Sequence, residues 1–138
     1  MNKEKGFTLI ELMVVIAIIG VLTAMIILGW RTYQDRADDI SIVNTMNQLA
    51  SFSESIRVRD GDYSAVSTEP QFTELEDSLP LEPSTINFVT GTDDLGRADR
   101  AYCASTTMLD GGSYYCVDSE FNSGRFATDP CDTGLVCQ

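Results

Sequence analysis

Hydrophobic and polar residues are distributed very unevenly along the chain. Residues 7–30, FTLIELMVVIAIIGVLTAMIILGW, form a nearly continuous apolar segment, whereas the remainder is polar and acidic. A helix of this length covers about 36 Å at ~1.5 Å per residue, which exceeds a membrane hydrocarbon core of about 30 Å. The pattern therefore predicts a membrane-spanning helix over residues 7–30.

A cleaved secretory signal peptide is the alternative explanation of such a segment. It would need a small-residue cleavage site after the apolar run, but here the run ends in Leu28–Arg31 and passes into further helical sequence. We therefore favour a retained span. Lys3 and Lys5 precede the span, which predicts a cytoplasmic N-terminus and an external C-terminal part.

The helical pattern continues beyond the apolar segment, because residues 31–59 contain neither Pro nor Gly. Apolar residues recur there every three to four positions, at Ile42, Met46, Leu49, Phe52 and Ile56, with Ile40 and Val43 widening the stripe. This spacing predicts an amphipathic helix with one face packed on a domain. The simplest interpretation is one helix from about Phe7 to Arg59, stopped by Gly61 as a left-handed cap.

Shorter elements are predicted after this helix. Turn residues at Asp110-Gly111-Gly112 separate two segments rich in β-forming residues, which is typical of a hairpin. The expected elements are a short helix over 68–78 with Thr68 as its N-cap, strands over 100–108 and 113–118, and a candidate short strand over 124–127. The predicted fold class is therefore α+β, with a long N-terminal helix and a small antiparallel sheet.

All four cysteines, Cys103, Cys116, Cys131 and Cys137, lie in the C-terminal third. An even number in a small domain behind a membrane span indicates disulfide bonds in an oxidising compartment. Cys103 and Cys116 fall on the two arms of the predicted hairpin, and Cys131 and Cys137 bracket a short loop. We favour the pairs Cys103–Cys116 and Cys131–Cys137, one of three possible pairings. The alternative is a zinc site, although spacings of 12, 14 and 5 intervening residues lack the close pairs of zinc ribbons.

Composition narrows the function classes. The net charge of −12 argues against nucleic acid as a partner, because phosphate binding needs clustered Lys and Arg. The chain has no His and no nucleotide-binding or hydrolase motif, so we expect neither an enzyme nor a cofactor. The acidic groups at 93–99 and 129–132 do not have the spacing of an EF-hand loop, and we assign no metal.

Glu11 is the exception inside the apolar segment. A carboxylate costs about 2.5–3.5 kcal/mol at the membrane centre and less near an edge, where the side chain can also snorkel to the headgroups. Its surroundings, GFTLIELM at residues 6–13, resemble the processing site of type IV prepilins and type II secretion pseudopilins. The shared features are a short charged leader, a Gly, an aromatic residue and a Glu inside the apolar run.

The resemblance implies that a prepilin peptidase removes residues 1–6 by cutting between Gly6 and Phe7 and then methylates Phe7. It further implies that the new amine of one subunit pairs with Glu11 of a neighbour, so that Phe7, Thr8 and Glu11 are the assembly residues. Both charges are costly in lipid, and each offsets the other. The proline that many type IV pilins carry later in this segment is absent here.

The implied organisation is a pilin fold with a long helix over residues 7–60 and an extracytoplasmic globular domain over residues 61–138. The expected partners are identical subunits in a helical filament, the prepilin peptidase, a pilus or secretion assembly platform, and membrane lipid before assembly. The expected location is the bacterial inner membrane and then an extracellular fimbrium.

The motif-level resemblance covers only the first 30 or so residues, so alternatives remain. A type IV pilus subunit is the favoured interpretation, and a pseudopilin of a type II secretion system is the nearest alternative. A signal-anchored domain that binds or senses a ligand without polymerising, or an anchored outer-facing enzyme, would share the apolar segment but would not assemble into filaments.

Overall fold

The computed structural model describes residues 7–80, 85–110 and 112–138. The chain divides into two compact units, Met1–Gln34 and Asp35–Gln138, which we describe separately. We call Asp35–Gln138 the head. The predicted leader, including Gly6, lies outside the described residues.

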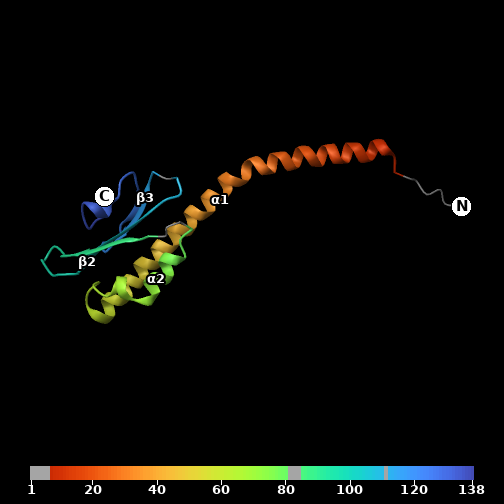
Figure 1. Ribbon diagram of the computed structural model, residues 1–138. Coiled ribbons are helices and arrows are strands. Elements are labelled where there is room, and N and C mark those ends of the chain that lie inside the picture. The colour runs from red at the N-terminus through yellow and green to blue at the C-terminus, as the bar shows by residue number, and fades with distance from the viewer. Residues whose placement is uncertain (1–6, 81–84, 111) are drawn as a thin grey trace. The chain divides into compact units, whose positions relative to one another are not determined.

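Helix α1 spans Leu9–Asp60, close to the predicted bounds (Figure 1). It stops at Gly61, which has a φ of +94° and donates its N–H to the Arg57 carbonyl at 2.9 Å. A side chain would be strained at this positive φ, whereas glycine accepts it freely. Gly61 therefore ends the helix as predicted.

The described part of the first unit, from Phe7 to Gln34, has no hydrophobic core. Residues Leu9–Ile27 of α1 form a 19-residue stretch that is long and apolar enough to cross a membrane, and none of it is buried. Large side chains such as Ile10 and Leu22 are more than half exposed. Because burying apolar area is the main favourable term in folding, this surface needs lipid or another chain around it.

The head has a continuous core between α1 and a sheet. One face of α1 is fully buried at Ile42, Met46 and Leu49, and the predicted stripe is confirmed there. Ile40 was expected to widen this stripe but is 61% exposed. Two residues before Ile42, it lies about 200° around the helix and faces away from the core.

Four antiparallel strands form the sheet in the order β1-β2-β3-β4. Their bounds are Asn87–Gly91, Ala101–Thr107, Tyr114–Asp118 and Ser123–Phe126. The predicted hairpin corresponds to β2 and β3, and the candidate last strand to β4. Strand β1 was not predicted. With the disulfides described below, these elements confirm the α+β class and its small antiparallel sheet.

Two short helices connect α1 to the sheet. The 3-10 helix η1 covers Val66–Thr68, and α2 covers Pro70–Asp77. The predicted N-cap Thr68 is wrong, because the N-cap of α2 is Glu69. The Thr68 hydroxyl donates backwards to the Ala65 carbonyl at 2.8 Å and closes η1 instead.

The disulfide pairing also differs from the prediction. The structure joins Cys103 to Cys131 and Cys116 to Cys137, so the predicted pairs Cys103–Cys116 and Cys131–Cys137 are wrong. The register explains the difference, since Cys103 lies opposite Asp118 and is therefore offset from Cys116 by two residues. Their sulfur atoms come within 3.5 Å without bonding. All four cysteines are in disulfides, which leaves no thiolate for the alternative zinc site.

Both disulfides attach the C-terminal segment to the sheet. This segment begins with the 3-10 helix η2, Pro130–Asp132, and crosses the face of β2 and β3. A Cβ atom on Gly91 would meet the Leu135 side chain at 2.4 Å, so the bare backbone of β1 makes room for the segment. The tail is thus an integral layer of the head.

Candidate functional site

The start of α1 has a complete capping box. The Thr8 N–H donates to Glu11 Oε2 at 2.9 Å, and the Thr8 hydroxyl donates to the same oxygen at 2.7 Å. In return, the Glu11 N–H donates to Thr8 Oγ1 at 3.3 Å. The two residues satisfy backbone donors that have no partner inside the helix, so they fix where α1 begins.

This geometry gives Glu11 a second capacity. Both bonds from Thr8 go to Oε2, which leaves Oε1 to accept from another donor. The negative charge also lies in the first turn, where it favours the positive end of the helix dipole. The carboxylate can therefore cap its own helix with one oxygen and, at the same time, bind a cation from outside the chain with the other.

The structure brings three predicted site residues into this one turn. Phe7 is 76% exposed and directly precedes Thr8, and Glu11 follows one helical turn later. Gly6, the other half of the predicted cleavage site, lies outside the described residues. The capping role of Thr8 was missed, although the spacing Thr-x-x-Glu before an apolar run is a recognisable signal.

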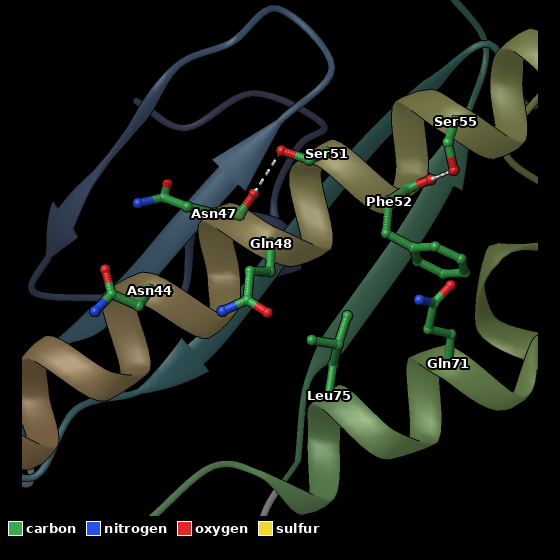
Figure 2. A pocket seen from close by; sticks show the side chains of 8 residues that line it. All are labelled: Asn44, Asn47, Gln48, Ser51, Phe52, Ser55, Gln71 and Leu75. Carbon is green, nitrogen blue, oxygen red and sulfur yellow. Dashed lines mark hydrogen bonds between the residues drawn. The ribbon is translucent and has the colours of Figure 1, made fainter.

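A second feature is a shallow groove of about 670 Å³ between α1 and α2 in the head (Figure 2). Its lining residues carry no charge, in contrast to the acidic chain as a whole. They are Asn44, Asn47, Gln48, Ser51, Phe52 and Ser55 on α1, with Gln71 and Leu75 on α2. Ser51 and Ser55 donate to carbonyls of their own helix, and the carboxamides of Gln48 and Gln71 extend into the space between the two helices.

The groove offers hydrogen bonds and apolar contact but no acid–base chemistry. None of its side chains titrates near neutral pH, and none is a nucleophile with an adjacent base. Its lining can contact a partner but supplies no catalytic group. The polar residues that α1 contributes to the groove can be read from the sequence. Their position beside α2 depends on the tertiary fold.

Three of the acidic residues considered for calcium are engaged within the head. Asp93 pairs with Arg97 at 2.6 Å, and the Arg97 guanidinium holds the pKa of Asp93 below its usual range. Asp99 accepts from the Thr90 hydroxyl at 2.8 Å. Asp129 accepts from Ser105 at 2.6 Å and from the Cys131 N–H at 2.9 Å. These carboxylates organise turns and the tail.

Taken together, the described features define a class of protein. An apolar helix without internal partners carries a capped, charged first turn, and its distal half belongs to a small disulfide-bonded α+β head. Such a chain depends on surroundings outside itself for its first unit and is self-contained in its second.

Comparison with known proteins agrees with this class. The family described as "Prokaryotic N-terminal methylation motif" matches residues 1–27. The chain is 33% identical over 88 residues to "Type IV wide pilus major component PilA4" of Thermus thermophilus, covering 64% of each protein. It is 41% identical over 71 residues to "Fimbrial protein" of Moraxella nonliquefaciens, covering 51% of this chain and 38% of that protein.

A secretion protein is similar to a comparable degree. The chain is 29% identical over 91 residues to "Type II secretion system core protein G" of Klebsiella pneumoniae, covering 66% of this chain and 64% of that protein. The matches thus span between 38% and 64% of the length of these three relatives. The motif and the relatives confirm the predicted resemblance to type IV prepilins and type II secretion pseudopilins.

Proposed function

We propose that this chain is a structural subunit that polymerises into a type IV pilus filament, and that it is not an enzyme. The names of its pilus relatives support a filament role. The observation that carries the proposal is the capped first turn of α1, which holds the Glu11 carboxylate one turn from Phe7 at the start of an unburied apolar helix.

The proposed sequence of events begins in the inner membrane. Residues 7–30 span the bilayer, residues 61–138 lie outside, and a prepilin peptidase cuts between Gly6 and Phe7 and methylates Phe7. The Thr8 N–H belongs to the Phe7–Thr8 peptide bond, which this cut leaves intact. The capping box therefore survives processing, and α1 keeps its first turn.

Processing creates a cationic amine on Phe7 at the same end of the helix. In lipid an unpaired amine and an unpaired carboxylate are each costly, and pairing them between subunits removes both costs. Oε1 of Glu11 is the acceptor for the amine of a neighbour, while Oε2 stays on Thr8. An assembly platform in the membrane is the expected site of this step, and the apolar helices then cover one another in the filament.

A pair of substitutions at Glu11 tests the proposal. Glu11→Gln keeps a capping side chain but removes the charge, whereas Glu11→Ala removes both. Both variants should insert into the membrane normally, and both should lower the amount of filament sheared from cells by about tenfold or more, since each ~1.4 kcal/mol of lost pairing is a factor of ten. Thr8→Ala, which weakens the cap and keeps the charge, is the matched control and should have a smaller effect.

Wild-type filament yield from Glu11→Gln would contradict the pairing of charges. Wild-type chains that stay as single subunits in the membrane would contradict the filament role itself. The pseudopilin alternative has its own support in the similarity to the secretion protein, and it predicts the same Glu11 effect on a short secretion fibre. Loss of protein secretion, with surface fibres unchanged, in a deletion strain would favour that alternative.

A further inference from the structure

Two aromatic residues lie at the far end of the apolar part of α1. Trp30 and Tyr33 are three positions apart on this helix, so their side chains project from the same side of it. Trp30 is 61% exposed and Tyr33 is 81% exposed. Between Phe7 and Trp30 the sequence contains no aromatic residue. The pair therefore marks the boundary between the apolar stretch and the polar sequence that follows it.

Both side chains combine an apolar ring with one polar group. Tryptophan and tyrosine are enriched where membrane hydrocarbon meets the lipid headgroups, because the ring enters the apolar region while the N–H or O–H group stays hydrated. A ring that is buried in a protein core is not available for this contact. Trp30 and Tyr33 are both largely exposed, so both can lie in a lipid interface.

The position of the pair along the helix matches the thickness of a bilayer. Glu11 and Trp30 are separated by about 28 Å along the helix axis at ~1.5 Å per residue, and the hydrocarbon core is about 30 Å thick. A typical tilt of about 20° shortens this projection by only about 2 Å. When Trp30 lies at the outer interface, Glu11 therefore lies at the inner edge of the hydrocarbon, where a carboxylate costs much less than at the centre.

The residues between these two ends suit the hydrocarbon but select no depth within it. Leu9–Ile27 is apolar apart from Glu11 and Thr23. The Thr23 hydroxyl donates to the Ile19 carbonyl at 2.8 Å, so it needs no partner from outside the helix. An apolar stretch of this kind can shift along the bilayer normal at little cost. The depth of the helix is therefore set by the groups at its two ends.

Charge at the outer end does not explain attachment to lipid. Residues 31–39 contain two arginines, at 31 and 36, and three aspartates, at 35, 38 and 39. The negative surface of anionic lipid attracts the arginines but repels the aspartates, and the aspartates are more numerous. Attachment at this end therefore depends on the two rings, and anionic lipid should change it little.

We infer that Trp30 and Tyr33 anchor the first unit in the outer lipid interface and thereby set the depth of the unprocessed chain. The inference rests on the membrane span of the proposed function, and it does not require filament assembly. At this depth Phe7 lies one turn beyond Glu11, in the inner headgroup region, where the proposed peptidase cut precedes it. Interfacial aromatic residues set the tilt and position of a span, so without them the cleavage site is held less well at that depth.

The depth of Trp30 can be measured directly, because it is the only tryptophan in the chain. The full-length chain is reconstituted in phosphatidylcholine vesicles that contain lipids brominated either near the headgroup or near the end of the acyl chain. Bromine near the headgroup should quench Trp30 fluorescence most strongly, and added phosphatidylglycerol should not change this order. Strongest quenching by bromine at the chain ends would contradict the inference. So would quenching by water-soluble acrylamide without quenching by either lipid.

The contribution of Tyr33 is measured with Trp30 as the probe. Tyr33→Leu removes the polar end of the second ring, so Trp30 should move deeper and quenching by bromine at the chain ends should increase. Tyr114→Leu makes the same change in the head and is the matched control, for which the quenching should equal that of the wild type. Equal quenching in Tyr33→Leu and the wild type would show that Tyr33 is not part of the anchor.

The consequence for processing is tested in the native host by pulse labelling, with removal of residues 1–6 as the readout. Trp30→Leu combined with Tyr33→Leu keeps the helix apolar, so the chain should remain in the membrane after carbonate extraction. Its rate of leader removal should nevertheless fall severalfold. Trp30→Tyr combined with Tyr33→Trp exchanges the two rings and keeps both interfacial groups, so this variant should retain the wild-type rate.

Two results would overturn the inference: a position of Trp30 at the bilayer centre or in water, or leader removal at the wild-type rate in the double leucine variant. Neither result concerns filament formation by the wild type, so the proposed function would stand without the anchor. A wild type in which Trp30 lies at the interface, but which is never recovered in filaments, would have the opposite meaning. The anchor would then stand, and the proposed filament function would fail.

Discussion

The two units of this chain differ in where their apolar side chains lie: on the surface in the first unit and in a core in the head. In the first unit the apolar side chains of Leu9–Ile27 are exposed to their surroundings, and the Thr8–Glu11 capping box organises the start of the helix. In the head, one face of α1 is buried at Ile42, Met46 and Leu49, and two disulfides secure the tail. The first part of α1 is thus suited to apolar surroundings outside the chain, and its second part to the core of the head.

This difference in burial indicates which unit carries the proposed function. A head that is complete in itself can stay folded in the membrane-bound subunit and in a filament alike. The first unit, in contrast, gains its stability only from lipid or from other chains, so a change of surroundings changes its energetics. Assembly is therefore expected to depend on the first unit, and folding on the head.

A matched pair of leucine substitutions is the strongest way to break this comparison. Leu49 is fully buried, so Leu49→Ala should lower the free energy of unfolding of the head by about 2–5 kcal/mol. Leu22 is 55% exposed, and Leu22→Ala should leave unfolding of the head unchanged. Denaturant titration of both detergent-solubilised variants by circular dichroism measures the difference. Equal destabilisation would contradict the separation into two units.

The disulfides sharpen the comparison within the head. They join residues 28 and 21 positions apart, and loops of this size predict a contribution of about 3–4 kcal/mol each in the chain-entropy model. Replacing Cys103 and Cys131 together with Ser should therefore lower the free energy of unfolding by that amount. Peptide mapping of the non-reduced wild type should recover Cys103 linked to Cys131. Recovery of Cys103 linked to Cys116 would contradict the described fold of the tail.

The smallest predicted effect concerns the buried carboxylate under the β3–β4 turn. Asp118→Asn replaces one acceptor oxygen with an amide that faces existing donors, and it should cost about 1–3 kcal/mol. Asp110 accepts N–H groups from Gly112 and Ser113 in an exposed turn, so Asp110→Asn is the matched control with a smaller expected cost. Thermal unfolding of both variants measures the two costs. Equal decreases in the unfolding temperature would show that the burial of Asp118 adds nothing to the stability of the head.

Local patterns in the sequence were sufficient for much of the fold. The helical stripe at Ile42, Met46 and Leu49 and the turn residues at 110–112 specify their elements through short-range spacing. The cap at Gly61 follows from its freedom at positive φ. The exposed position of Ile40 could also have been predicted, because it lies on the opposite side of the helix from Ile42.

The features that were missed depend on contacts distant in sequence. The disulfide pairing follows from the register of β2 against β3 and from the path of the tail, neither of which leaves a local signal. Strand β1 exists because it pairs with β2, and its Gly91 accommodates Leu135. The β3–β4 turn is held by the Asp118 carboxylate, which is buried by the fold. The Thr8 cap was the exception, since its signal was present in four residues.

The most direct test of the central claim is mass spectrometry of the N-terminus of chains recovered from sheared surface filaments of the native host. The account predicts a mature chain that begins at N-methylated Phe7 and retains Glu11 unmodified. Filaments built from chains that still carry residues 1–6 would contradict it, because no amine would then be available at Phe7 to pair with a neighbouring carboxylate.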